Sequence, residues 1–174
     1  SEMCIRDRLM IIEKFWITST FTSAITRLIA PLTAIMFVDD TDLFLNALPT
    51  TPTKEIGRRA QLLISKWCNA LWITGGCLRP EKCSWYLIHF KWDKDGNWRY
   101  SKIHETPYDL IIPDDKQRPH IIKRTEIDIG TKGLGVYLEP SGHGKTQLEI
   151  MRTSSTMWAN KMKHNIISQY SASL

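Results

Sequence analysis

Hydrophobic and polar positions alternate in the first third of the chain in a way that predicts a β-hairpin. The β-prone apolar run 33–38 stops at Asp39 and Asp40, and a second apolar run, 43–45, follows at once. Two apolar runs around an acidic pair are typical of antiparallel strands joined by a tight bend that carries the carboxylates. The stretch 15–29 is apolar but rich in Thr and Ser, and its pattern does not distinguish helix from strand.

Two later stretches carry apolar residues at helical spacing. The first begins at 51–53, where a capping residue, a proline and a nearby acid favour a helix N-terminus, and it ends at Gly75-Gly76. Its predicted buried face consists of Ile56, Ala60, Leu63, Ile64, Trp67, Cys68 and Leu71. The second predicted helix runs from about Lys145 to Gln169, with an apolar stripe of Leu148, Met151, Trp158, Met162 and Ile166.

Shorter patterns complete the predicted secondary structure. Aromatic and β-branched residues at 85–92 and 98–100, separated by Asp95-Gly96, predict a second hairpin. Prolines and charges over 104–120 predict a surface loop, and the apolar run 134–138 predicts another strand. We therefore expect an α+β fold with a small antiparallel sheet and packed helices, followed by a basic helical segment.

Positive charge is concentrated in the last third of the chain. The whole chain has 23 Lys and Arg against 18 Asp and Glu, a formal net charge of +5. Residues 1–115 hold 14 of each sign, so the excess lies in 116–174, with 9 basic and 4 acidic residues. A basic excess at one end suits a surface that meets a phosphate backbone, although a solvated basic tail has the same composition.

Composition excludes disordered and membrane-spanning classes. Hydrophobic residues make up 43% of the chain, as in a packed globule, and no apolar run approaches the roughly 20 residues that span a bilayer. Cys4, Cys68, Cys77 and Cys83 lack zinc-site spacing and predict reduced thiols in an intracellular protein, nuclear or cytoplasmic. Residues 1–8 resemble a translated adapter sequence and are a candidate artefactual or fusion segment.

Asp39 and Asp40 are the central candidates for metal ligands. Two carboxylates at a tight turn repel each other, and a divalent cation offsets that repulsion. Hard oxygen ligands suit Mg²⁺ and Mn²⁺, which serve two-metal phosphoryl transfer. An Asp-Asp pair by itself also occurs in turns that bind no metal, so the surrounding motifs are needed to distinguish a metal site from an ordinary turn. Asp42 is interpreted as a surface residue of the outgoing strand.

The motifs follow one another in a recognisable order. The acidic pair stands in Phe37-Val38-Asp39-Asp40, and the predicted helix leads into Gly75-Gly76-Cys77-Leu78-Arg79-Pro80-Glu81-Lys82. The strand 134–138 contains a Leu-Gly pair and precedes the basic helix. In this order the blocks resemble a reverse transcriptase of a retroelement, in the non-LTR-like branch, over most of residues 20–165.

The resemblance assigns a part of the polymerase to each block. The first block resembles the aromatic-x-Asp-Asp hairpin of the palm. The second resembles the family's Gly-Leu-x-Leu-Asn-Pro-x-Lys block, with Arg79 where Asn is usual. The strand resembles the primer grip and the basic helix the start of a thumb. Residues 9–115 would then be a partial palm, and 116–174 a primer-grip-like strand with the beginning of a thumb.

The resemblance also implies roles for individual residues. Asp39 would bind catalytic Mg²⁺ or Mn²⁺ and Asp40 would support that site, while Lys82 would lie near the incoming nucleotide's phosphates. A solvated loop lysine is the other reading of Lys82. An RNA template and a DNA primer would be the partners, contacted by Lys132, Arg152, Lys161 and Lys163. The motif-shaping residues would be Phe37, Gly75, Leu78, Pro80 and Gly135.

The family's other metal aspartate and its fingers precede the palm hairpin. None of Glu2, Asp7 and Glu13 stands in a matching strand context. We therefore expect the chain to be inert alone, with metal-dependent nucleotidyl transfer belonging to a full-length parent. The alternative is a non-catalytic nucleic-acid-binding module or a decayed retroelement remnant.

Two other patterns have competing readings. Residues 142–146 resemble part of a phosphate-binding P-loop, but Glu139 occupies the position where that loop needs glycine, so an NTPase is not favoured. The aromatic residues near Lys91 and Arg99 suit base stacking or cross-strand core packing, and we favour the core. They are Trp85, Trp92, Trp98 and Tyr100.

Overall fold

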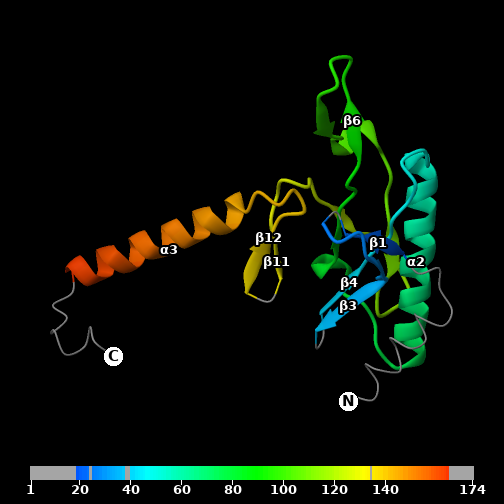
Figure 1. Cartoon of the computed structure of the whole chain (residues 1–174). Coiled ribbons are helices and arrows are strands. Elements are labelled where there is room, and N and C mark those ends of the chain that lie inside the picture. The colour runs from blue at the N-terminus through cyan, green and yellow to red at the C-terminus, as the bar shows by residue number, and fades with distance from the viewer. Residues whose placement is uncertain (1–18, 24, 38–39, 134, 165–174) are drawn as a thin grey trace. The chain divides into compact units, whose positions relative to one another are not determined.

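The structure is a computed structural model, and it describes residues 19–23, 25–37, 40–133 and 135–164. The chain divides into two compact units, which we describe separately. The first combines the chain up to Trp85 with residues 101–125, and the second combines residues 86–100 with those from Glu126 onward. Figure 1 shows the order of the elements along the chain.

The first unit contains helix α2 and a series of two-stranded sheets. Its strands are β1 (Thr20–Thr22), β2 (Ile29–Pro31), β3 (Ala34–Phe37), β4 (Asp40–Leu43), β5 (Ser84–Trp85), β8 (Ile111–Pro113), β9 (Pro119–Ile121) and β10 (Lys123–Arg124). Its helices are α2 (Thr53–Ile73) and the short 3₁₀ turns η1 (Pro80–Lys82) and η2 (Ile103–Glu105). β1–β2, β3–β4 and β8–β9 are antiparallel hairpins, whereas β5 and β10 pair in parallel.

The second unit contains two hairpins and a long helix. β6 (Phe90–Trp92) pairs with β7 (Trp98–Tyr100), and β11 (Thr131–Gly133) pairs with β12 (Val136–Leu138), each antiparallel. Helix α3 (Lys145–His164) follows β12 and contacts it, and Figure 1 shows the helix running on from that hairpin. Both units mix helices with small sheets, as the α+β prediction requires.

Helix α2 forms the core of the first unit, and its prediction is confirmed. Trp67 and Leu71 are the buried centre of one apolar cluster, against which Met36 and Leu43 of the β3–β4 hairpin pack. Cys68 belongs to a second cluster. The helix ends where Gly75 adopts a positive φ of 77°, a conformation that side-chain-bearing residues rarely adopt.

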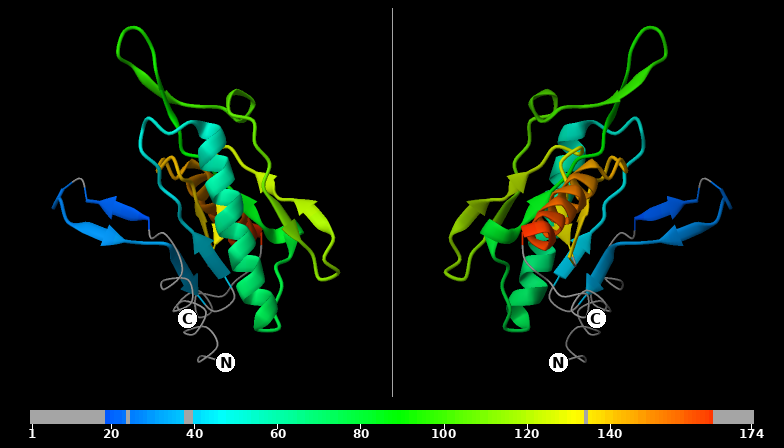
Figure 2. Two further views of the ribbon diagram at one scale, coloured as in Figure 1. Left: turned by 90° about the vertical axis from the view of Figure 1, so that its right-hand side faces the viewer. Right: turned by 90° about the vertical axis from the view of Figure 1, so that its left-hand side faces the viewer.

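The prediction of a surface loop over 104–120 is wrong. Leu110, Ile112 and Ile122 are buried and share the second cluster with Cys68 of α2. Figure 2 shows the β8–β9 hairpin beside α2, and the two are in contact. The Gln61 side chain of α2 bonds both the amide and the carbonyl of Ile111, at 2.8 and 2.7 Å. The segment is therefore part of the core.

Proline was misleading in this segment because the edge of a two-stranded hairpin tolerates it. Pro113 and Pro119 face each other at the turn end of β8–β9, where a missing N–H breaks no interior ladder. The Asp114 carboxylate closes the turn by accepting bonds from the Lys116 and Arg118 amides. Burial of Asp114 acts to raise its pKa, but bonds from Arg118 and His120 hold that pKa well below its usual range.

Other predicted boundaries shift by a few residues. The ambiguous stretch 15–29 contributes β1 and the start of β2, so its described part is strand and turn. The outgoing strand of the first hairpin begins at Asp40 rather than at residue 43. The described part of the last helix ends at His164, and its predicted end at Gln169 lies outside the described residues. Across the part of the chain that the structure describes, no helix has the length and apolar character to cross a membrane.

Candidate catalytic hairpin and nucleic-acid interface

The β3–β4 hairpin has a tight register. Phe37 pairs with Asp40, so its connection consists of Val38 and Asp39 alone. Those two connecting residues lie outside the described part of the chain, and the metal-binding prediction for Asp39 falls there. Asp40 is the first residue of β4 and is exposed. The described member of the acidic pair, Asp40, therefore lies at the turn end of a short hairpin.

The two faces of this hairpin have different surroundings. Met36 and Leu43 project toward α2 and pack against its buried residues. Asp40 and Asp42 alternate with them along β4 and are both exposed. Ile35, directly across from Asp42, is 52% exposed. One face thus anchors the hairpin to α2, while the other presents the Asp40 and Asp42 carboxylates.

The donor chemistry of the hairpin suits a hard divalent cation. Mg²⁺ usually keeps several waters and binds through one or two protein carboxylates together with substrate phosphates. Asp39 and Asp40 supply that number of carboxylates, and Asp40 is accessible. Within the described ranges, no three His, Cys, Asp or Glu side chains come together. Metal binding by Asp39 and Asp40 therefore stays a prediction.

The Gly75–Lys82 block is tied to the same helix as the hairpin. Leu78 packs against both apolar clusters of the first unit, including the one that holds Met36 and Leu43. Pro80 opens the turn η1, in which the Lys82 amide donates to the Arg79 carbonyl. The Lys82 side chain is exposed. The structure thus anchors this block and the acidic hairpin through one helix and leaves Lys82 accessible.

The primer-grip-like segment forms a hairpin rather than a lone strand. β11 pairs with β12, and Gly133 lies opposite Val136. Gly135 takes the positive φ of 87° that the turn requires, which explains a glycine at this position. Lys132 in β11 is exposed.

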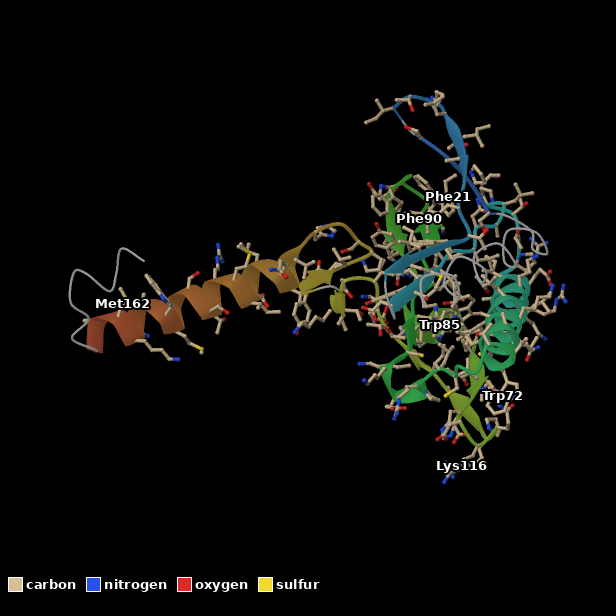
Figure 3. All side chains as sticks on the ribbon, turned by 90° about the horizontal axis from the view of Figure 1, so that it is seen from below. Phe21, Trp72, Trp85, Phe90, Lys116 and Met162 are labelled. Atoms are coloured by element: carbon tan, nitrogen blue, oxygen red, sulfur yellow. The ribbon has the colours of Figure 1, made fainter. Side chains whose placement is uncertain are left out.

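Helix α3 exposes its apolar stripe as well as its basic residues. Arg152, Lys161 and Lys163 are exposed, as expected for a nucleic-acid contact. Leu148 and Trp158 are also 50% and 64% exposed, so the predicted apolar stripe is not covered within the described residues. Figure 3 shows side chains projecting all around this helix, with Met162 labelled near its end.

The P-loop-like stretch before α3 has a different role. The buried Glu139 carboxylate accepts a hydrogen bond from the Thr146 amide in the first turn of α3. Bonds from Thr146 lower the pKa of Glu139, which keeps the carboxylate charged. Because a negative group already occupies the positive end of the helix, a phosphate would be repelled there. The position of Glu139 at the start of α3 is therefore unfavourable for a phosphate-binding P-loop.

The three cysteines in the described part of the chain are free thiols. Cys68, Cys77 and Cys83 are unpaired, and burial raises the pKa of the Cys68 thiol to about 11. Burial also raises the pKa of Cys83. A raised pKa disfavours the thiolate, so Cys68 and Cys83 are poor nucleophiles.

Sequence reasoning missed the exposure of the β6–β7 hairpin. Trp92 and Trp98 are 69% and 52% exposed, so the preference for core packing is wrong for them. Trp85 is different, because it packs against the buried cluster of the first unit. Lys91 and Arg99 alternate with the aromatic residues, and such strict alternation was the signal for a two-faced hairpin.

Comparisons with known proteins gave no relatives. No protein-family model matches the chain, and searches of curated proteins and of solved structures found no significant match. The resemblance to reverse transcriptases therefore rests on the motifs and their order.

Proposed function

We propose that this chain is part of a reverse transcriptase, comprising a portion of the palm and the start of the thumb. Its parent would carry out metal-dependent nucleotidyl transfer on a DNA primer with an RNA template. The observation that carries the proposal is the β3–β4 hairpin, whose register leaves only Val38 and Asp39 between Phe37 and the exposed Asp40. The shared anchoring of this hairpin and of the Lys82 block on α2 supports it.

In this proposal the chain's own residues hold and orient the reacting groups. Asp39 and Asp40 would hold Mg²⁺, which supplies activation of the primer hydroxyl and charge neutralisation at the phosphate. Lys82 would face the phosphates of the incoming nucleotide and donate a proton to the departing pyrophosphate. The packing of Met36 and Leu43 on α2 would keep the hairpin rigid, since catalysis of this kind depends on positioning.

The proposal predicts a magnesium-dependent component in binding to a primer–template duplex. For the 174-residue chain, affinity for a fluorescent RNA–DNA duplex should rise with Mg²⁺ at constant ionic strength. Asp39→Asn should weaken the apparent Mg²⁺ affinity by about tenfold or more, because even the loss of a supporting group around a metal costs about 10–100-fold. Fluorescence anisotropy measures both quantities.

Asp42→Asn is the matched control for this experiment. It removes one carboxylate charge from the exposed face that carries Asp40, about 6.6 Å along β4 from Asp40 and outside the aromatic-x-Asp-Asp motif. The Mg²⁺ response should survive this change. An equal loss in Asp39→Asn and Asp42→Asn would contradict the proposal, because it would show a general effect of charge.

A non-catalytic nucleic-acid-binding module is the second candidate, and the exposure of α3 favours it. Arg152, Lys161 and Lys163 are exposed on this helix. Such a module would bind with a steep salt dependence, since each neutralised phosphate releases a counterion. Strong salt dependence with no Mg²⁺ response in the same anisotropy experiment would favour the module over the polymerase fragment.

A further inference from the structure

The β6–β7 hairpin of the second unit has one aromatic face. Phe90 lies opposite Tyr100, and Trp92 lies opposite Trp98. Directly opposed residues project to the same side of a hairpin, as do residues two apart on one strand. All four rings therefore belong to one face, and the intervening pair, Lys91 and Arg99, belongs to the reverse face.

The aromatic face is accessible and its rings support one another. Phe90 and Trp98 meet edge to face with ring centroids 5.4 Å apart, and Tyr100 lies 5.2 Å from Phe90 and 5.3 Å from Trp98. Phe90 is nevertheless 47% exposed and Trp92 69%. Figure 3 labels Phe90 on this hairpin. Phe90, Trp98 and Tyr100 thus form a cluster of touching rings, and Trp92 on the same face is the most exposed of the four residues.

Hydrogen bonds in the turn of this hairpin stabilise the strands that carry the aromatic face, which we call the aromatic platform. The Asp93 carboxylate accepts bonds from the amides of Asp95 and Asn97 and from the Asn97 side chain. These bonds lower the pKa of Asp93, so the group is ionised and engaged at neutral pH. Gly96 supplies the positive φ of 82° that the turn needs. A platform ordered in advance loses little entropy when it binds a ligand.

Residues 90–100 carry a small excess of positive charge, with Lys91, Lys94 and Arg99 against Asp93 and Asp95. Lys94 is exposed in the turn, and Lys91 and Arg99 flank the rings from the reverse face. Unpaired nucleotides offer both matching features, a π-face on each base and a phosphate between bases.

We propose that the aromatic face of β6–β7 binds single-stranded nucleic acid, with bases stacking on Trp92 and Trp98. The phosphates are attracted by Lys91, Lys94 and Arg99. This site lies apart in sequence from the acidic hairpin and is carried by the second unit. Its ligand class rests on the proposed function, whereas its residues are independent of those expected to bind metal.

The experiment measures the affinity of the full chain for a fluorescent 12-nucleotide oligo(dT). Trp92→Leu keeps an apolar side chain but removes the π-face, and it should weaken binding by about 5- to 150-fold, as stacking losses of this kind do. Trp92→Phe should retain most of the affinity. Trp72→Ala, on α2, removes a comparably exposed indole and should change nothing. Lys94→Gln should reduce the slope of log affinity against log salt by about one.

The outcomes separate this proposal from the proposed function. Wild-type chain that does not bind oligo(dT), or binding that is equal in Trp92→Leu and wild type, overturns the stacking site. If only Asp39→Asn loses the duplex Mg²⁺ response, the metal proposal stands without the stacking site. If only Trp92→Leu loses oligo(dT) binding, the stacking site stands without the metal proposal. The stacking site is also overturned if Trp92→Leu weakens binding to phosphatidylserine vesicles but leaves oligo(dT) binding unchanged.

Discussion

Replacing Ile112 with alanine is expected to lower the free energy of unfolding by about 2–5 kcal/mol. Ile112 has no exposed surface and lies at the centre of the cluster that joins β8 to α2. Removing its side chain leaves a cavity between Leu110, Ile122 and Cys68, which cannot fully collapse because α2 and the hairpin are linked through Gln61. Urea denaturation followed by circular dichroism measures the change.

Ile121→Ala is the control for this effect. Ile121 lies in β9 of the same hairpin but is 65% exposed, so its truncation should change the unfolding free energy by no more than about 0.5 kcal/mol. If Ile112→Ala and Ile121→Ala had equal effects, residues 104–120 would not belong to the core, and the original interpretation as a surface loop would return.

Replacing Gly57 with alanine is expected to destabilise the chain by about 1–3 kcal/mol, the usual cost of overpacking. A Cβ at this position of α2 would lie 2.5 Å from Cγ of the Tyr108 ring and 2.6 and 2.7 Å from the adjacent ring carbons. These atoms are at the base of the ring, so the whole side chain must move. Thermal denaturation should show a lower midpoint.

Two comparisons isolate the clash at Gly57. In a Tyr108→Ala background the same Gly57→Ala change should become stabilising by up to about 1 kcal/mol, because alanine favours helix over glycine. Asn69→Ala, at an exposed position of α2, should have little effect. A destabilisation of Gly57→Ala that persists without the Tyr108 ring would rule out the steric explanation.

Local patterns predicted the elements whose signals are local. The helix was predicted from its apolar spacing, and α2 buries Trp67, Cys68 and Leu71 of the predicted face. The first hairpin followed from apolar runs on either side of an acidic pair. In both cases neighbouring residues carry the determinant, which is why a single sequence sufficed.

Features that depend on distant partners were not predictable in the same way. Ile112 belongs to the core because it packs against α2, some fifty residues earlier in the chain. The prolines at the ends of β8 and β9 favoured a loop in the sequence pattern, so this role was not predicted. The aromatic residues of β6 and β7 have a core-like composition, and only their surroundings show that they are exposed. Burial is a tertiary property, and composition reports it only on average.

In the candidate site, too, features with local signals were predictable and features that depend on tertiary contacts were not. The exposed Asp40 at the start of β4 and the glycine turns at Gly75 and Gly135 follow from short motifs. The Lys82 block and the β3–β4 hairpin are both anchored on α2. The spacing of residues in the sequence does not predict this shared anchor, because it depends on Leu78 packing against both apolar clusters.

Manganese-induced broadening of amide signals in the ¹⁵N-labelled chain tests the central claim most directly. Mn²⁺ replaces Mg²⁺ at hard oxygen sites and broadens only signals close to it. If the hairpin binds metal, signals around the β3–β4 turn, including that of Asp40, will broaden selectively; this broadening will disappear in Asp39→Asn and persist in Asp42→Asn. Absence of selective broadening at this turn, or broadening that survives Asp39→Asn, would contradict the assignment of the hairpin as a polymerase metal site.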